Sequence, residues 1–174
     1  MDEAVLVEVR PAAELGDDLR GQIAQWTVDM FGVEELKYEW SRPDWHVLVW
    51  LGDELVTQLA ITERVAQVGG EAVRLAGIGG VMTPKQLRGR GLANAAMRSA
   101  VYFMKNTLDA EFGLLLCSAR LVPYYERLGW QLVAAPVRFE QSTGDEMWEE
   151  EAMVMAFTDR PWPPGAVALC GPPW

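Results

Sequence analysis

Apolar residues in this chain recur with two periods, which predict helices and strands. Spacings of three and four residues predict amphipathic helices over residues 17–31 and 91–108, and a shorter helix over 121–128. Within residues 32–44 we expect a short helix and a loop. The chain should therefore alternate between helical segments and a larger number of strands.

Most strands are predicted by alternating or continuous apolar runs bounded by turn residues. Gly52-Asp53 and Gly69-Gly70 predict turns, so the strands around them should form an antiparallel meander. The run 112–117 is apolar throughout, as is typical of a buried central strand. This order predicts an α+β fold with a mixed, mostly antiparallel sheet. The expected strands are 4–10, 46–51, 54–68, 73–82, 112–117, 130–139 and 151–158.

Length and composition indicate one domain. The chain has 174 residues, of which 50% are hydrophobic, enough for one substantial core. We expect that domain to span residues 1–158. The remaining segment, 159–174, holds five of the ten prolines together with Trp162 and Trp174, and we expect it to be extended.

The formal net charge is −10, which disfavours binding to nucleic acid or to anionic membranes. No apolar run is long enough to span a membrane, and the acidic start is unlike a signal peptide, so we expect a cytoplasmic protein. Two distant cysteines and a single histidine predict neither a disulfide framework nor a metal site. Lys85, Arg88 and Arg90 form a local basic island that suits an anionic ligand.

A glycine-rich loop is the strongest functional motif. Residues 86–93, Gln-Leu-Arg-Gly-Arg-Gly-Leu-Ala, follow a predicted strand and open a predicted helix. Glycines let a ligand approach the backbone, and the free N–H groups and dipole of the helix start favour an anion. Two flanking arginines add donors for phosphate oxygens. The loop, called the phosphate loop below, therefore predicts a pyrophosphate site.

Other pyrophosphate motifs do not fit. A P-loop requires Gly-Lys-Ser/Thr, which is missing here, and the dinucleotide fingerprint requires a third glycine where Asn94 stands. The pattern present is Gln86-x-x-Gly89-x-Gly91. It resembles the coenzyme A loop of the GCN5-related N-acetyltransferase (GNAT) superfamily, which implies acetyl-CoA as the donor and a GNAT fold over about residues 4–158.

A narrower resemblance rests on four stretches of sequence. They are similar to stretches of the aminoglycoside 2′-N-acetyltransferases, whose chains also end in a short tail with a terminal Trp, and in part to the nodulation acyltransferases. The stretches are Gly80-Val81, Leu87 to Leu92, Leu116 to Arg120 and Tyr125 to Trp130.

The resemblance implies roles for specific residues. In the family, backbone N–H groups at the end of the strand before the loop bind the pantetheine arm and the thioester carbonyl. The family's tyrosine, four residues before a glycine, matches Tyr125, whose phenol (pKa about 10) can protonate a thiolate (pKa about 8.5). The cofactor-binding residues implied are Val81, Met82, Thr83, Arg88, Gly89, Arg90, Gly91, Leu92, Ala93 and Ser118.

The general base is not singled out by spacing. The aminoglycoside enzymes carry a glutamate where this chain aligns Gly79, so the base comes from elsewhere or through water. We nominate Glu63 as the catalytic carboxylate. The alternatives left open are Glu39, His46 and the acidic loop with Asp145, Glu146 and 149–151. Tryptophans in loops, namely Trp40, Trp45, Trp148 and Trp174, are candidates to line the acceptor site.

Together these features predict an acetyl-CoA-dependent N-acetyltransferase for a small cationic amine, such as an aminoglycoside or a polyamine. The same phosphate loop fits a non-catalytic acyl-CoA-binding sensor or scaffold, and an N-acyltransferase for longer chains. A homodimer is a further expectation, because the tail could pack across two copies.

Overall fold

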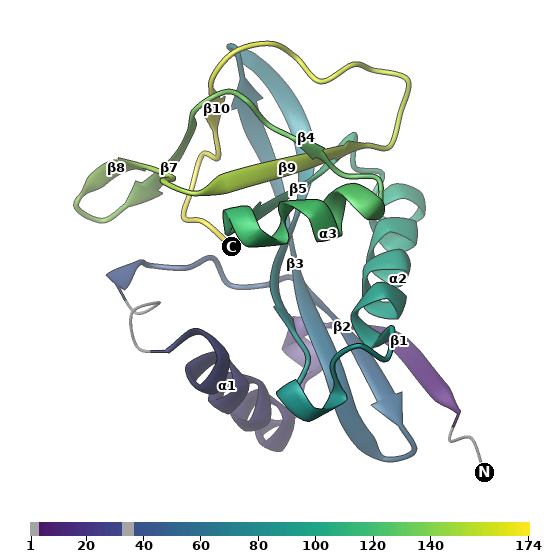
Figure 1. Ribbon diagram of the computed structural model, residues 1–174. Coiled ribbons are helices and arrows are strands. Elements are labelled where there is room, and N and C mark those ends of the chain that lie inside the picture. Colours follow the sequence, from purple (N-terminus) through teal and green to yellow (C-terminus); the bar gives the residue numbers. More distant parts are fainter. Residues whose placement is uncertain (1–3, 33–36) are drawn as a thin grey trace.

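The computed structural model describes residues 4–32 and 37–174, and within them a mixed sheet carries three α-helices (Figure 1). The helices are α1 (Asp17–Phe31), α2 (Leu92–Asn106) and α3 (Val122–Arg127). Short 3-10 turns are η1 (Ala12–Glu14), η3 (Lys85–Leu87) and η4 (Ala119–Leu121). The strands are β1 (Val5–Pro11), β2 (Trp45–Leu51), β3 (Glu54–Val68), β4 (Glu71–Met82), β5 (Phe112–Cys117), β6 (Gln131–Leu132), β7 (Val137–Gln141), β8 (Gly144–Met147), β9 (Glu151–Ala156) and β10 (Val167–Ala168).

All these strands join one sheet. Its main path runs β6-β9-β5-β4-β3-β10-β7-β8, and β1 and β2 branch from β3. Tight turns link β2, β3 and β4 into the antiparallel meander that the sequence predicts. Two neighbouring pairs are parallel, β4 with β5 and β10 with β7. The sheet is thus mostly antiparallel, with a parallel pair near its centre.

The parallel pair β4–β5 separates before either strand ends. Pairing runs from Leu75–Phe112 to Ile78–Leu115, while β4 continues to Met82 and β5 to Cys117. On its other side β4 carries one extra residue against β3, because Gln58 pairs with Met82 whereas Ala60 pairs with Gly79. A bulge of this kind bends a strand and re-aims its backbone groups. The ends of β4 and β5 are therefore unpaired with each other.

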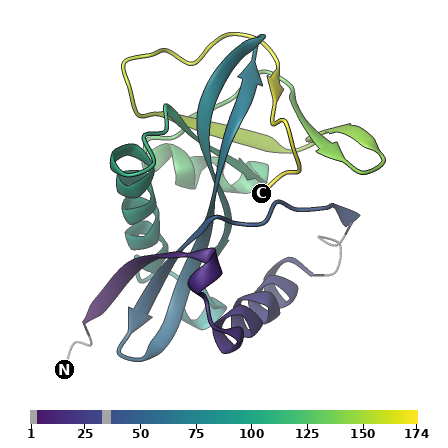
Figure 2. The same cartoon turned by 180° about the vertical axis from the view of Figure 1, so that it is seen from behind.

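Helices α1 and α2 lie on opposite sides of the meander, as both ribbon views show (Figure 2). The buried face of α2 carries Leu92, Ala96, Met97, Ala100 and Met104, at helical spacing. They pack with β2, β3 and β4 in one core cluster, and a second cluster forms under β7 and the segment 159–174. None of α1's residues is fully buried, so this helix rests more loosely on the sheet.

Most predicted elements are confirmed, several to within one or two residues, and the α+β class is correct. The predicted strand 130–139 is instead two strands, β6 and β7. Pro136, which has no N–H to donate to a ladder, lies between them. The acidic loop after it contains β8, paired with β7 across a turn at Ser142 and Thr143. Part of the predicted short helix, 33–36, lies outside the described residues, and 38–44 have no helix or strand.

The segment 159–174 crosses the top of Figure 1 and returns to the centre of the molecule. It contains β10, which pairs with β3 and β7, and it ends at the buried Trp174. Among the described residues, no helix is both long and apolar enough to cross a membrane.

Candidate active site

The phosphate loop lies between the unpaired end of β4 and the start of α2. Gly89 and Gly91 have φ values of +78° and +77°, in the left-handed region that favours glycine. A Cβ at either position would contact nothing within 4 Å. Both glycines are therefore required by the backbone path itself, and the space in front of the loop is open.

The start of α2 is free to bind an anion. Gly91 is its N-cap, no side chain caps the helix, and the first turn contains no acidic residue. The first intrahelical bond is donated by Ala95 N–H to Gly91 O, so the N–H groups of residues 92–94 have no partner within the helix. The helix dipole adds positive potential at these donors. This geometry suits phosphate oxygens, the ligand atoms predicted from the sequence.

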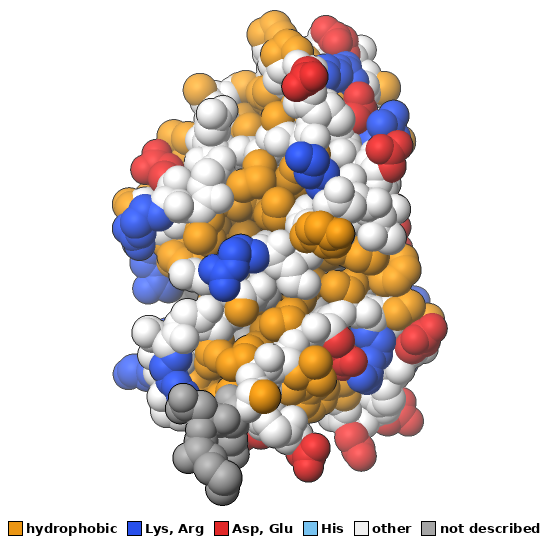
Figure 3. Space-filling model, turned by 90° about the vertical axis from the view of Figure 1, so that its right-hand side faces the viewer, with side chains coloured by type: hydrophobic (Ala, Val, Ile, Leu, Met, Phe, Trp, Pro, Cys, Tyr) orange, Lys and Arg blue, Asp and Glu red, His pale blue; other side chains and the backbone are white. Residues whose placement is uncertain are grey.

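The loop arginines are exposed beside these donors. Arg88 folds back on the loop, and its Nε donates to Thr83 O over 3.0 Å. Arg90 and Lys85 are exposed in the same loop region. Figure 3 shows the face to the right of Figure 1, where Lys and Arg side chains lie among apolar ones and acidic side chains gather mainly toward its margins. An acidic protein thus keeps a locally basic surface.

The last residues of β4 face different layers. Val81 packs against the core under α2, whereas Met82 is buried and its Sδ is 3.8 Å from Thr27 Oγ1 of α1. The Thr83 hydroxyl hydrogen-bonds the Thr57 hydroxyl over 2.8 Å. These contacts fix the side chains of the predicted binding strand, while its backbone toward β5 stays unpaired.

Tyr125 lies beside the end of β5. It is 6% exposed and belongs to the same core cluster as Cys117, the last residue of that strand. Burial raises the pKa of Tyr125 well above 10, and the nearby Cys117 raises it further. Burial also raises the pKa of the Cys117 thiol to about 11. At neutral pH both groups are protonated, so Tyr125 can act only as a proton donor.

Ser118 follows Cys117 directly and is the N-cap of η4, where its carbonyl accepts the Leu121 N–H. Its side chain does not cap that turn. The structure thus places Val81 to Thr83 at the end of β4 and Ser118 and Tyr125 at or beside the end of β5.

Glu63 lies elsewhere on the sheet. It is exposed on β3, paired with Ala76, which in turn pairs with Gly113 of β5. This level is four residues before Cys117, or about 13 Å along a strand. Its Oε2 accepts a hydrogen bond from Trp45 Nε1 over 3.1 Å. Glu63 is therefore separated from Tyr125 by the width of β4 and about four residues of strand.

The space above Gly77 and Gly79 is filled by the chain itself. A Cβ on Gly77 would collide with the indole of Trp174, and one on Gly79 would lie 2.6 Å from the Trp174 carbonyl carbon. The Trp174 indole also donates to Leu114 O over 3.3 Å. Position 79 therefore has no room for the glutamate that the aminoglycoside enzymes carry there, because Trp174 occupies the space beside it.

Arg64, which the sequence did not single out, holds the segment 159–174 in place. Its guanidinium donates to the carbonyls of Pro172 and Leu169 over 2.7 and 3.5 Å, and to Ser41 Oγ over 2.6 Å. It also lies 5.2 Å from the Trp174 ring centroid. Partial burial lowers the pKa of Arg64. Sequence patterns could not predict the contacts of Arg64 with Leu169 and Pro172, because these residues lie more than 100 positions away along the chain.

A second unpredicted feature is a buried polar chain. His46 Nδ1 contacts Gln58 Oε1 at 2.9 Å, and Gln58 Nε2 donates to Gly80 O at 2.6 Å. Both side chains are buried, Gln58 being 1% exposed. No clear sequence signal marks this chain of contacts, because β3 carries several other polar residues and His46 stands out only as an alternative base.

The predicted aromatic candidates divide between three places. Trp40 and Trp148 lie 6.3 Å apart between ring centroids and both contact Tyr38. Trp45 instead packs against Phe103 of α2, and Trp174 lies on Gly77. Lys37 Nζ lies 4.5 Å from the Tyr38 ring centroid, near Glu146 and Glu149. The cluster of Tyr38, Trp40 and Trp148 is thus an aromatic surface that already attracts a cation.

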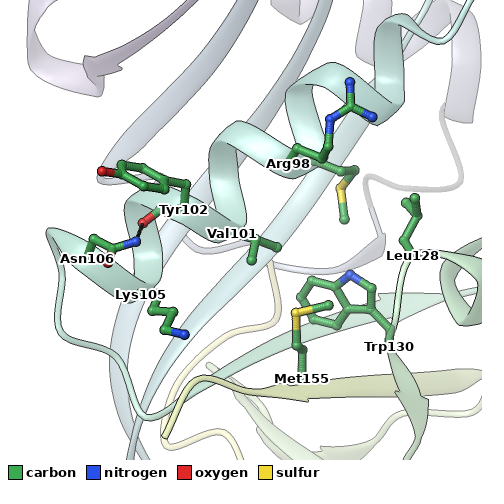
Figure 4. A pocket seen from close by; sticks show the side chains of 9 residues that line it. Arg98, Val101, Tyr102, Lys105, Asn106, Leu128, Trp130 and Met155 are labelled. Atoms are coloured by element: carbon green, nitrogen blue, oxygen red, sulfur yellow. Dashed lines mark hydrogen bonds between the residues drawn. The ribbon is translucent and has the colours of Figure 1, made fainter.

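A pocket of about 360 Å³ lies against the second half of α2 (Figure 4). Trp130 and Met155 lie opposite the helix, which contributes Arg98, Tyr102, Lys105 and Asn106 to the lining. The Trp130 Nε1 is buried without a hydrogen-bond partner among the described residues. Lys105 lies about 21 Å along the helix from Gly91, so much of this pocket lies far from the phosphate loop.

Known proteins resemble this chain over most of its length, both in sequence family and in fold. Residues 18–133 match the family described as acetyltransferase (GNAT) domain. Among solved structures, Escherichia coli ElaA has 20% identity and a TM-score of 0.63, and the match covers 87% of this chain and 99% of that one. At such identities the likeness concerns the fold. No curated protein matches this chain by sequence.

Two further solved structures contain the cofactor. The E. coli GNAT family N-acetyltransferase YhbS in complex with CoA has 17% identity and a TM-score of 0.65, with coverage of 98% of this chain and 93% of that one. A GNAT family acetyltransferase from Brucella melitensis in complex with acetyl-CoA has 16% identity and a TM-score of 0.58, with coverage of 94% and 95%.

Proposed function

Because the chain belongs to the GNAT acetyltransferase family, we propose that it binds acetyl-CoA and transfers the acetyl group to the primary amine of a small cationic acceptor. The observation that carries this proposal is the uncapped start of α2, which follows Gly89 and Gly91 beside the unpaired ends of β4 and β5. Family members solved with CoA and acetyl-CoA support the same donor.

In this proposal the phosphate loop binds the pyrophosphate. The N–H groups of Leu92 and Ala93 donate to phosphate oxygens, and Arg88 and Arg90 add charge. Acetyl-CoA supplies the activated acetyl group. The backbone of Val81 to Thr83 holds the pantetheine arm and the thioester carbonyl, and Ser118, directly after β5, contributes to the same site. A donor aimed at that carbonyl oxygen stabilises the negative charge that develops there.

Tyr125 is the proposed general acid. Its raised pKa keeps the phenol protonated, and its place beside the end of β5 suits a departing thiolate. Glu63 remains the proposed base, and because its strand level lies about four residues before the end of β5, we propose that it acts through water. Tyr125→Phe and Glu63→Gln separate these roles, because each removes one proton-transfer group and leaves the phosphate loop intact.

The acceptor class is supported by the aromatic surface of Tyr38, Trp40 and Trp148. Lys37 shows that a cation already lies over the Tyr38 ring, with Glu146 and Glu149 nearby. Cation–π contact and carboxylates together favour an amine-bearing ligand. Aminoglycosides and polyamines both meet this requirement, and the likeness to aminoglycoside 2′-N-acetyltransferases makes aminoglycosides the first class to test. The cytoplasmic location and the homodimer stay predictions.

The direct test is release of CoA thiol from acetyl-CoA over a panel of aminoglycosides, polyamines, amino acids and peptides. We expect release with at least one cationic amine. Binding of CoA without release for any acceptor would instead support the sensor or scaffold, and release only from longer acyl-CoA donors would support the longer-chain acyltransferase. Calorimetry that detects no CoA binding at millimolar concentration would contradict all three.

The catalytic role of Tyr125 is tested in the same assay. Tyr125→Phe should lower kcat by about 10²-fold or more, as is typical when a general acid is removed, with little change in CoA affinity. Tyr102→Phe, an exposed tyrosine on α2, is the matched control and should retain parental activity. Equal kcat for Tyr125→Phe and the parent would remove Tyr125 from the mechanism.

A further inference from the structure

We propose that Gln58 is a positioning residue that aims the Val81 N–H at the thioester carbonyl, with His46 holding Gln58 in place. The inference rests on the proposed function and adds to it a side chain from a neighbouring strand. It begins from the bulge in β4, which places Gly80 at φ +56° and leaves Gly80 and Val81 without partner residues in the β3 register.

The orientation of one peptide plane carries the argument. The bond between Gly80 and Val81 is trans, so the Gly80 carbonyl and the Val81 N–H point in opposite directions within one plane. Gln58 Nε2 donates to the Gly80 carbonyl over 2.6 Å. The Val81 N–H must therefore point away from Gln58. No residue of β5 pairs with Val81, because the β4–β5 ladder stops at Ile78.

Without Gln58 this plane would be free to turn. Gly80 is glycine in the left-handed region, and a residue without Cβ rotates with little steric resistance. The bulge takes both residues out of the ladder that would otherwise fix them. The hydrogen bond from the buried Gln58 side chain is therefore the main contact that fixes the Gly80–Val81 peptide on the side facing β3.

His46 completes the support. Its Nδ1 lies 2.9 Å from Gln58 Oε1, an acceptor, so the Nδ1 carries the proton. The Gln58 amide then has one partner for its oxygen and one for its nitrogen, and it cannot exchange the two without losing both bonds. The two hydrogen bonds, with His46 and with the Gly80 carbonyl, therefore fix the Gln58 amide with its nitrogen toward Gly80.

The test compares Gln58→Glu, Gln58→Met and the parent. In its ionised form, glutamate at position 58 still accepts from His46 but cannot donate to the Gly80 carbonyl, while Met removes both bonds at similar length. Gln67→Glu, on the same strand, makes the same chemical change away from the bulge and is the matched control.

Three readouts are needed. In cofactor-free protein labelled with ¹⁵N, the Val81 amide resonance should move in both Gln58 variants and stay in place in Gln67→Glu. With acetyl-CoA, kcat should fall about tenfold or more while the CoA Kd changes less than about threefold, because a misaimed oxyanion donor affects the reaction more than binding. The infrared stretch of a ¹³C-labelled acetyl carbonyl on a bound, unreactive analogue should shift toward its value in water.

The outcomes separate this inference from the proposed function. A parent protein that binds acetyl-CoA but releases no thiol with any acceptor contradicts the transferase function, and the NMR and infrared readouts then decide the role of Gln58 alone. An active parent whose Gln58 variants keep the Val81 resonance, the carbonyl stretch and kcat contradicts the role of Gln58 and leaves the transferase intact. If Gln58→Glu does not fold, Gln58→Met decides by the same three readouts.

Discussion

The indole of Trp174 occupies the space that a side chain on residue 77 would need, nearly 100 residues earlier in the chain. The same residue places its main chain against Gly79. Two glycines of a central strand, Gly77 and Gly79, therefore form part of the surface against which Trp174 packs. This relationship ties the composition of β4 to the packing of a distant aromatic residue.

Gly77→Ala should destabilise the protein by about 1–3 kcal/mol, because the added methyl group displaces a buried indole. Trp174→Ala should cost about 3–5 kcal/mol through the lost contacts. In the Trp174→Ala background, Gly77→Ala should cost little, since the obstacle is gone. Urea unfolding of the two single variants, the double variant and the parent measures this coupling.

Gly21→Ala is the control for that series. Gly21 lies within α1, is exposed, and a Cβ there meets nothing within 4 Å. Alanine at this position should stabilise the protein by about 0.5–1 kcal/mol, as it does at unstrained helical sites. Purely additive costs for the Gly77 and Trp174 variants would contradict direct contact between the two residues.

Gly91→Ala should weaken CoA binding at least about tenfold, equivalent to about 1.4 kcal/mol. The added Cβ has room but disfavours φ +77°, so the loop relaxes away from the geometry that presents the helix N–H groups. Gly70→Ala introduces similar strain, at φ +86° and without a clash, in a distant turn. Calorimetry with CoA should find unchanged affinity for Gly70→Ala, and equal loss in both variants would exclude a specific role for the loop.

Arg88→Ala should weaken CoA binding but hardly affect dephosphorylated pantetheine, because its guanidinium is expected to contact only phosphate oxygens. Arg138→Ala, an exposed arginine of β7 paired with Asp145, is the control of equal charge change. Calorimetry with both ligands decides the matter. Equal losses for CoA and pantetheine would argue against a phosphate contact.

Much of the fold could be predicted, because most of its helices and strands are marked by patterns of neighbouring residues in the sequence. Residues 54–68 and 112–117 were assigned to strands with the same bounds that the structure shows, since apolar runs between turn signals are local features. The phosphate loop was found for the same reason. Its glycines, arginines and helix start are contiguous in sequence.

The parts that could not be predicted depend on distant residues. Arg64, Ser41 and Pro172 form one hydrogen-bonded group, yet no spacing rule links them. The role of Gln58 depends on a bulge whose register is set by two strands together. The glutamate expected at position 79 is missing because Trp174 fills that space, which only the packed chain can show.

Arg64→Met should destabilise the protein by about 2–3 kcal/mol, because the carbonyls of Leu169 and Pro172 lose a charged donor in a partly buried site. Arg74→Met is the control, since the Arg74 side chain is 56% exposed, its pair with Asp109 lies in solvent and its contact with Glu111 is as long as 4.0 Å. This variant should cost less than about 1 kcal/mol. Chemical unfolding of both variants measures the difference. Limited proteolysis should also cut the segment 159–174 sooner in Arg64→Met than in Arg74→Met.

His46 should make stability depend on pH below about 6.5. Burial lowers the pKa of His46 in the folded protein, and the nearby Arg20 lowers it further, although the hydrogen bond with Gln58 opposes both. The unfolded chain then binds a proton more readily, so stability is full above pH 6.5 and falls as the pH drops toward the folded pKa. Glu111, whose pKa is lowered from 4.5, adds a separate loss only at more acidic pH. His46 is the one histidine of the chain, so unfolding of His46→Asn measured from pH 7.5 to 5 should show a flatter profile than the parent. An unchanged slope in His46→Asn would assign the pH dependence to another group.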